Sequence, residues 1–495
     1  MYPFRTATPE QVGVSSLWID QFLTRLASRG LMMHSVMMLR HGLVFAEGYY
    51  APFRQQDKHR MYSVSKSFVA TAIGMLADEG RLQLSDKVVN YFPDKVPADA
   101  HPYIREMTIR DLLRMATPYS YTTYVGDTED WARTFFTSKP DHPPGTLFSY
   151  DTSGSYILTV IVERIAQMPM LDYMRERGLE ALGFSKDAWC VKAPEGNSWA
   201  GSGVICTTRD MALLGLVYRN GGMLDGKRLL SESYTREATR RQIDNATQGA
   251  RDYMHGHGYG YQIWMTHDDS YAFAGMGGQL MICIPRLDMI FACTADLQGA
   301  PSDYQPIFGA LWEEIIVHMD REPLAANPKA AALLEQRLQS LRLALPSGEP
   351  FSPFERGCWG NEYAMHDNVM GVRSIRITRD NDRGELTMVK DGQVKRIDFG
   401  FGQYAEGNFP EDGYWGDTIA VPAGRPYRYF AAAAWSEPRK LVIRVNIADD
   451  YFGNLTITLA FKDRQIALQM VKNAEWFLDG YQGFAGGELI DPNPA

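Results

Sequence analysis

The chain has 495 residues, of which 45% are hydrophobic and 22% charged, so it is long enough to bury more than one core. Its formal net charge of -9 at pH 7 leaves no basic footprint, which argues against a nucleic-acid partner. No stretch approaches the roughly 20 apolar residues that span a bilayer, and the first residues show no apolar leader. We therefore expect a cytoplasmic protein of roughly two to four domains, without a membrane span.

The cysteine and histidine patterns favour neither a disulfide framework nor a metal centre. The five cysteines are scattered and form no CxxC pair. His255 and His257 form an H-x-H pair, but in the glycine-rich segment HGHGYG turn histidines are more typical than ligands. We expect no metal and no cofactor.

The first elements in chain order are a helix, a hairpin and a second helix. Apolar residues at helical spacing predict the first helix over residues 16–30. The segment 34–50 predicts two strands that turn at Arg40–His41–Gly42. The second helix is predicted from Ser63 to Gly80. Its end is placed at Gly80 because glycine is favoured directly after the last residue of a helix.

Helical patterns broken by Pro- and Gly-rich loops fill residues 85–250. Strands are predicted again from Tyr259, Gly278 and Asp288, and a helix over residues 305–319 closes this region. Strands, a long helical insertion, further strands and a closing helix are typical of an α+β domain with an antiparallel sheet flanked by helices.

Three regions follow from these patterns. Residues 1–321 are predicted to form the α+β domain, with its helical subdomain over about 85–250. Residues 322–349 are predicted to be a helical connector. In residues 350–495 apolar residues recur at every second position, as in 455–461, where Leu, Ile and Phe alternate with Thr and Ala. This alternation predicts an antiparallel, barrel-like all-β domain.

Ser63 and Lys66 form the S-x-x-K of the segment MYSVSKSF. Three residues are about one helical turn, so the two side chains lie on one face and can meet. A serine hydroxyl becomes a nucleophile when a neighbour takes its proton, and a buried lysine can do so. An isolated S-x-x-K is more often an ordinary helix face, so the interpretation depends on further segments. P-loop, zincin, nucleophile-elbow and dinucleotide signatures do not occur.

Two further segments contain groups that could take part in catalysis. Tyr150 follows a Pro-Gly turn in PPGTLFSYDTSGSYIL, and a phenol beside an ammonium can shuttle a proton. The alternative is a half-buried tyrosine before a helix that Asp151 or Thr152 caps. In FAGMGGQ the glycines allow a strand edge to approach a ligand and present the N–H of Met276, although a hairpin without function has the same pattern. Aromatic residues at 119, 121, 124 and 131 either line a pocket or pack in the core.

These segments, together with MTIRDLLRMATP, GSGVICTTRD and YGYQIW, occur in the order seen in the serine β-lactamase and penicillin-binding-protein-like family, class C branch, which residues 5–320 resemble. The resemblance implies an antiparallel sheet flanked by helices, a helical subdomain and a cleft between them. It implies that Ser63 is the acylated nucleophile, Lys66 its activator and Tyr150 the first residue of the Y-x-N element. The N–H groups of Ser63 and Met276 would form the oxyanion hole.

The resemblance also implies a set of substrate-binding residues, and two of its positions depart from the family pattern. The expected set is Tyr62, Thr152, Phe273, Gly275 and Gly277. Thr152 stands where the Y-x-N element has asparagine, and Phe273–Ala274–Gly275 stands where the family has K-T-G or H-x-G, so a cation that holds a substrate carboxylate is missing. The pattern is more similar to family esterases and 6-aminohexanoate-dimer hydrolases, which favours a small ester or linear amide as substrate.

Two other functions remain open at this point. One is a D-aminopeptidase, D,D-peptidase or weak β-lactamase, which a signal peptide would support. The other is a non-catalytic binding protein of the same fold, which the missing asparagine and lysine motivate. A homodimer and the role of the C-terminal β domain also stay open.

Overall fold

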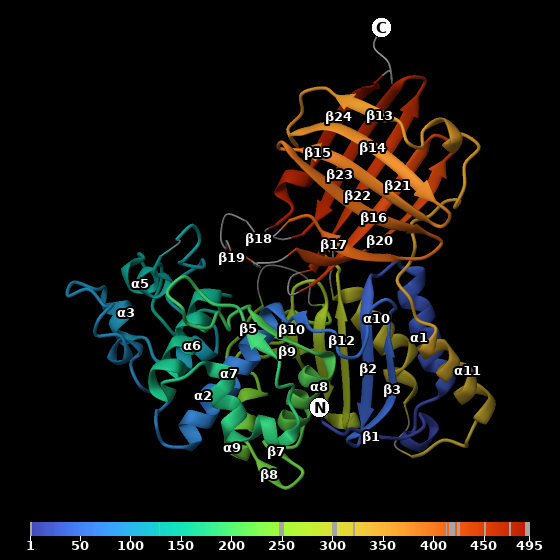
Figure 1. The fold of residues 1–495 in the computed structure, drawn as a ribbon. Coiled ribbons are helices and arrows are strands. Elements are labelled where there is room, and N and C mark those ends of the chain that lie inside the picture. The colour runs from blue at the N-terminus through green and yellow to red at the C-terminus, as the bar shows by residue number, and fades with distance from the viewer. Residues whose placement is uncertain are drawn as a thin grey trace. The chain divides into compact units, whose positions relative to one another are not determined.

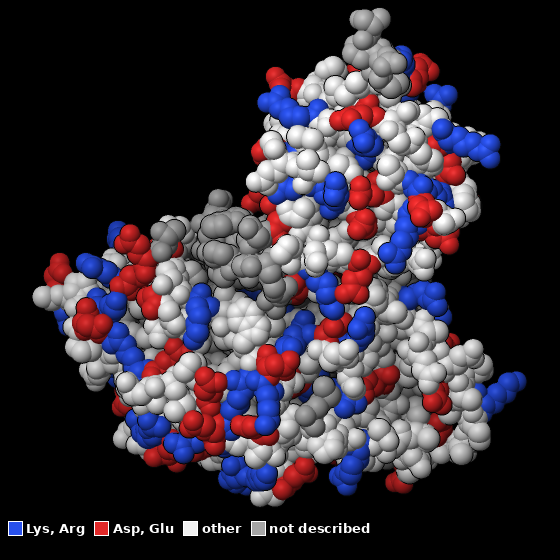
Figure 2. All heavy atoms as spheres, viewed as in Figure 1, with Lys and Arg blue, Asp and Glu red and all other residues white. Residues whose placement is uncertain are grey.

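The computed structural model describes residues 2–127, 129–246, 252–298, 304–319, 322–411, 413–414, 421–422, 426–449, 452–474 and 477–490. The chain divides into two compact units, Met1–Arg342 and Leu343–Ala495, and each is described by itself (Figure 1). None of the helices within the described ranges is long and apolar enough to cross a bilayer. Acidic and basic side chains are interspersed over the described part of the face that Figure 2 draws.

The first unit is built on a seven-stranded sheet with the order β1-β3-β2-β12-β11-β10-β9. Neighbouring strands are antiparallel except for the short parallel pair of β1 with β3. The strands of this sheet are β1 (Arg5–Thr6), β2 (Met33–Arg40), β3 (Leu43–Tyr49), β9 (Trp264–Thr266), β10 (Ser270–Gly275), β11 (Gln279–Ile284) and β12 (Met289–Ala295). Minor pairings join β4 (His59–Arg60), β5 (Trp189–Cys190) and β6 (Val204–Cys206), and join β7 (Met223–Leu224) to β8 (Lys227–Arg228).

The α-helices of this unit cover the sheet and form a helical region beside it (Figure 1). They are α1 (Ser16–Ser28), α2 (Ser65–Asp78), α3 (Pro102–Glu106), α4 (Ile109–Leu113), α5 (Trp131–Thr137), α6 (Thr152–Ala166), α7 (Met170–Met174), α8 (Thr208–Arg219), α9 (Glu232–Ala238), α10 (Gln305–Glu314) and α11 (Pro328–Gln339). The shorter helical turns are η1 (Glu10–Val12), η2 (Tyr62–Val64), η3 (Val88–Tyr91), η4 (Arg175–Leu179), η5 (Glu180–Leu182), η6 (Pro285–Leu287) and η7 (Ile316–His318).

Alternating side chains of the sheet meet helices on opposite faces. Phe291 of β12 packs edge-on against Phe22 of α1, with ring centroids 5.6 Å apart. Met281 of β11 lies on the other face, where its side chain contacts α8 so closely that a Cβ on Gly215 would come within 2.9 Å of the Met281 sulfur. Because successive residues of a strand point to opposite faces, the apolar strands bury both sides of this sheet.

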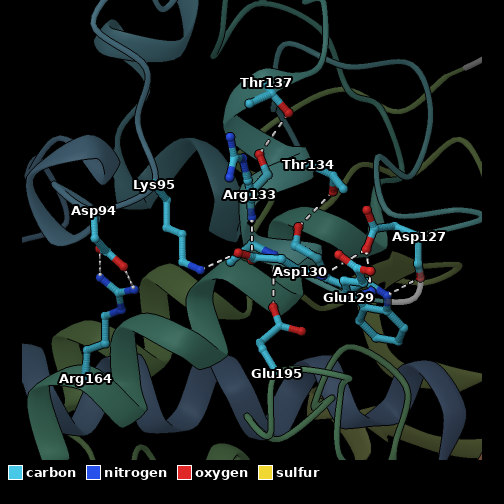
Figure 3. Close-up of polar contacts among 12 residues, drawn as sticks. Asp94, Lys95, Asp127, Glu129, Asp130, Arg133, Thr134, Thr137, Arg164 and Glu195 are labelled. Atoms are coloured by element: carbon cyan, nitrogen blue, oxygen red, sulfur yellow. Dashed lines mark hydrogen bonds and ion pairs between the residues drawn. The ribbon is translucent and has the colours of Figure 1, made fainter.

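Polar contacts at helix ends hold the helical region together, as Figure 3 shows around α5. The side chain of Asp130 caps α5 by accepting a hydrogen bond from Arg133 N at 3.0 Å, and it also pairs with Lys95. Glu195, far along the chain, accepts a bond from Ala132 N at 3.0 Å. These bonds satisfy N–H groups that a helix start leaves without a partner inside the helix.

Most of the predicted elements of this unit are present, although several have other bounds; the second helix, for example, begins at Ser65 and not at Ser63. The hairpin turns at His41–Gly42, and the second helix is followed by Gly80 in the left-handed region. The prediction of a strand from Tyr259 was wrong, because Gln262 takes a left-handed φ of 56° and turns the chain, so that β9 begins only at Trp264. The helix expected over 305–319 ends at Glu314 and continues as the short turn η7.

The second unit is a closed antiparallel β-barrel, which confirms the predicted fold class of an α+β domain followed by an all-β domain. The order is β16-β15-β14-β13-β24-β23-β22-β21-β20, and a parallel pairing of β16 with β20 closes the ring. The elements are β13 (Glu362–Met365), β14 (Val372–Asp380), β15 (Arg383–Lys390), β16 (Gln393–Phe401), β17 (Ala405–Phe409), β18 (Gly413–Tyr414), β19 (Val421–Pro422), β20 (Tyr427–Glu437), β21 (Lys440–Ala448), β22 (Phe452–Lys462), β23 (Gln465–Asn473), β24 (Gly483–Leu489), η8 (Glu355–Gly357) and η9 (Asp479–Tyr481).

Candidate active site

Ser63 lies in the turn η2, directly before helix α2 begins at Ser65. The turn is held on both sides: Met61 N donates to Val204 O at 2.8 Å, and Val64 N donates to Met61 O at 3.1 Å. Tyr62 has a left-handed φ of 46°, a conformation that costs a non-glycine residue about 1–2 kcal/mol. The turn therefore presents the half-buried Ser63 from a strained and tightly held backbone.

Lys66 lies one helical turn after Ser63, as the spacing predicted. Its side chain is buried, with 1% of its surface exposed. Its Nζ donates to Ser63 Oγ at 3.0 Å and to the carbonyl oxygen of Gly201 at 2.6 Å. The amine is thus aimed at the hydroxyl from which it would have to take a proton.

Tyr150 is the third residue predicted to take part in catalysis, and it lies in a distant segment, the loop that precedes α6. Lys66 Nζ lies 5.0 Å from the centroid of its ring. Although 37% of the residue's surface is exposed, burial around its hydroxyl raises the pKa of Tyr150 to about 12, and a hydrogen bond with Ser63 partly offsets this. The phenol therefore keeps its proton near neutral pH, a state suited to donating a hydrogen bond or a proton.

The end of β10 directly contacts the turn that contains Ser63. A Cβ built on Gly275 would lie 2.1 Å from Met61 O and 3.1 Å from Val64 N, so only glycine fits there. Met276 follows in the loop to β11, and Gln279 Nε2 holds its carbonyl oxygen at 3.1 Å. The tertiary structure thus brings the Met276 backbone next to the segment of Ser63, although the two are more than 200 residues apart in the chain.

The remaining predicted substrate-binding residues lie in different surroundings. Tyr62 is 2% exposed and its ring lies under the guanidinium of Arg60, 4.4 Å from the ring centroid. Thr152 is half-buried at the first residue of α6, and Gly277 is a turn residue whose carbonyl oxygen accepts from Leu297 N at 3.0 Å.

Phe273 is a core residue. Only 1% of its surface is exposed, and its ring packs edge-on against Tyr218 of α8 at 5.4 Å. Of the aromatic residues considered for a pocket, Tyr119, Tyr124 and Trp131 are 0–2% exposed and belong to the core, whereas Tyr121 is 44% exposed.

The H-x-H pair is tied to Asp252. His255 Nδ1 lies 2.9 Å from Asp252 Oδ2, and His257 Nε2 lies 2.8 Å from the Asp252 carbonyl oxygen. Within the described ranges there is no group of three or more His, Cys, Asp or Glu side chains placed to hold a metal ion.

Sequence reasoning did not single out two residues that support the site. The carbonyl oxygen of Gly201 accepts from Lys66, and a Cβ on Gly201 would lie 2.9 Å from the methyl group of Thr152. Gln262 links three segments: its Oε1 accepts from Ser155 Oγ at 2.6 Å, its Nε2 donates to Leu112 O at 2.8 Å, and its own carbonyl oxygen accepts from the Ser67 hydroxyl. No sequence pattern marks such contacts, since each depends on segments that meet only in the folded chain.

Asp151, directly after Tyr150, is the residue that caps α6. Its carboxylate is fully buried and accepts bonds from Ser153 N at 2.8 Å, Gly154 N at 3.3 Å and Thr117 Oγ1 at 3.0 Å. Burial raises the pKa of Asp151 from 3.8 to about 6, because desolvation disfavours the carboxylate more than these bonds favour it.

This shift predicts a pH-dependent stability. A folded-state pKa above the unfolded value means that the folded chain binds the proton more tightly, so this contribution to stability is full below about pH 4 and is lost as the pH rises through about 6. The variant Asp151→Asn should lack it, and the free energy of unfolding of wild type relative to the variant should fall by about 2–3 kcal/mol between pH 4 and pH 7. Urea unfolding of both proteins at several pH values measures this, and parallel curves would contradict the assignment.

The chain is similar in sequence to known proteins. The model of the beta-lactamase family matches residues 19–312. The 6-aminohexanoate-dimer hydrolase of Paenarthrobacter ureafaciens is 26% identical over 281 residues, which cover 51% of this chain and 70% of that protein. Penicillin-binding protein 4 of Amycolatopsis lactamdurans is 32% identical over 127 residues, or 24% of this chain and 33% of that protein.

Solved structures give the same fold. A family VIII carboxylesterase superposes with a TM-score of 0.52 at 17% identity, covering 63% of this chain and 99% of that chain. A penicillin-binding-protein homologue from Caulobacter crescentus superposes with a TM-score of 0.50 at 17% identity, covering 63% and 98%. The resemblance inferred from the sequence motifs is therefore confirmed.

Proposed function

The chain belongs to the beta-lactamase family, and on that premise we propose that it is a serine hydrolase that forms an acyl-enzyme on Ser63 and cleaves a small ester or linear amide. The observation that carries the proposal is the 3.0 Å contact of Lys66 Nζ with Ser63 Oγ, and the ring centroid of Tyr150 lies 5.0 Å from the same Nζ. A candidate nucleophile, a candidate base and a candidate proton donor thus lie close together.

In the proposed reaction Ser63 Oγ attacks the substrate carbonyl carbon while its proton moves to Lys66 Nζ. The N–H groups of Ser63 and Met276 stabilise the oxyanion of the tetrahedral intermediate. Tyr150 donates its proton to the leaving oxygen or nitrogen as the carbon–heteroatom bond breaks, and it regains a proton from Lys66. In the second half of the reaction Tyr150 passes its proton to Lys66 and takes a proton from a water molecule, which attacks the acyl carbon. Ser63 Oγ then leaves with the proton from Lys66, and the acid is released.

Two observations favour a small ester or linear amide over a β-lactam. The segment Phe273–Ala274–Gly275 offers no cationic side chain for a carboxylate, and Phe273 is buried. A relative that matches 51% of this chain is named for the hydrolysis of the 6-aminohexanoate dimer, a linear amide.

Trapping of the intermediate tests the proposal. We expect p-nitrophenyl butyrate to leave a butyryl group on the peptide that contains Ser63, detected by mass spectrometry after rapid acid quenching. The variant Ser63→Ala should show no adduct on that peptide. A stable adduct with a penicillin alone would instead favour the D,D-peptidase or β-lactamase alternative, and the absence of any adduct with either probe would favour a non-catalytic binding protein.

A further inference from the structure

The ring of Tyr150 lies in a group of aromatic rings beside Ser63. It stacks on Trp264, with ring centroids 5.4 Å apart and an interplanar angle of 23°, and it meets Tyr259 edge-on at 6.4 Å and 90°. With 37% of its surface exposed, Tyr150 is not locked by burial on every side. Its stacking partner Trp264 therefore limits how far the ring can swing.

Trp264 is itself held in a fixed orientation. It is the first residue of β9 and pairs with Ala272 of β10, so its backbone belongs to the sheet. Its ring is met at nearly right angles by Tyr259 at 5.1 Å and by His255 at 5.4 Å. Asp252 holds His255 in turn, through the His255 Nδ1 contact at 2.9 Å and a bond from His255 N at 2.6 Å. Such edge-to-face and stacked pairs stabilise the relative orientation of the rings beyond the area they bury.

We propose that Trp264 is a positioning residue of the proposed hydrolase, which sets the plane and direction of the Tyr150 ring so that its hydroxyl can donate its proton to the leaving group beside Ser63. The inference rests on the proposed function. The O–H bond of a phenol lies in the plane of its ring, so an aromatic neighbour that fixes the plane also fixes the direction in which the proton can be donated. Lys66 Nζ lies over the face of the ring, 5.0 Å from its centroid, and so outside this plane.

The proposal predicts a loss in the chemical step rather than in substrate binding. Displacement of a catalytic group by about 1 Å can cost up to about 10²-fold in rate. The variant Trp264→Leu should lower kcat for p-nitrophenyl butyrate by about 30-fold, with KM changed by less than about threefold. The variant Trp264→Phe keeps a flat ring for stacking and should recover kcat to within about fivefold of wild type.

A double-mutant cycle with Tyr150→Phe tests whether Trp264 acts through the Tyr150 hydroxyl. In the Tyr150→Phe background, Trp264→Leu should lower kcat by less than about twofold, because the proton donor is already absent. Trp189→Leu, which replaces a half-exposed tryptophan of β5, is the matched control and should keep kcat within about twofold. Thermal unfolding of each variant separates loss of fold from loss of rate.

Three results would overturn the role of Trp264. They are an equal loss in both backgrounds, a rise in KM at unchanged kcat, and a failure of Trp264→Phe to recover activity while folded. Each would occur with turnover that still depends on Ser63. Turnover that Ser63→Ala retains would overturn the proposed function instead, so the two failures are distinguishable.

Discussion

Replacing Ser63 by alanine is expected to lower kcat for p-nitrophenyl butyrate by roughly 10⁴- to 10⁶-fold, the range found when a nucleophile of a cooperating catalytic set is removed. Without Oγ there is no atom to form the acyl bond, and neither Lys66 nor Tyr150 can substitute for it from its present position. Because Ser63 is half-buried and lies in a turn held by backbone bonds of its neighbours, the variant should keep its fold. Initial rates and thermal unfolding measure the two effects.

Ser67, which lies in α2 about one helical turn after Ser63, offers a matched control. It is 1% exposed and its hydroxyl donates to Gln262 O at 2.9 Å, so Ser67→Ala removes a structural bond worth about 1 kcal/mol. We expect this variant to lose some stability and to keep kcat within about threefold. Comparable activity of Ser63→Ala and wild type would show that another group is the nucleophile.

Replacing Lys66 by methionine is expected to lower kcat/KM by about 10³-fold, within the range attributed to general acid–base catalysis. Methionine fills much of the buried space but accepts no proton from Ser63. The carbonyl oxygen of Gly201 loses its 2.6 Å partner, which should cost about 1–3 kcal/mol in the free energy of unfolding. Lys66→Arg should be nearly as inactive, because a guanidinium does not deprotonate in the working pH range.

Lys192 provides the control for the loss of a lysine that bonds a serine. Its Nζ donates to Ser198 Oγ at 3.1 Å, much as Lys66 donates to Ser63, but in a different part of the unit. We expect Lys192→Met to keep kcat/KM within about threefold. An active Lys66→Arg variant would mean that residue 66 supplies only positive charge, and this result would contradict the proposed proton transfer to Lys66.

Features that depend on neighbours in the chain were readable from the sequence. The helix that carries Lys66 and the hairpin at His41–Gly42 follow from apolar spacing and from glycine, which act over one or two turns. The one-turn spacing of Ser63 and Lys66 predicted that both side chains lie on one face, and in the structure Lys66 Nζ lies 3.0 Å from Ser63 Oγ. The strand start predicted at Tyr259 was wrong, because the chain turns at Gln262, whose side chain is bonded to the distant Leu112 and Leu113 carbonyls.

The sequence by itself determined the α+β and all-β classes of the two units, the family, and three residues, Ser63, Lys66 and Tyr150, as candidates for chemistry. Only the tertiary structure decided that the Gly275 backbone contacts the turn that contains Ser63, that Phe273 points into the core, and that Trp264 stacks on Tyr150. The physical reason is range: propensity, capping and periodicity act within about a helical turn, whereas these contacts arise when strands and loops far apart in the chain are packed at van der Waals distance.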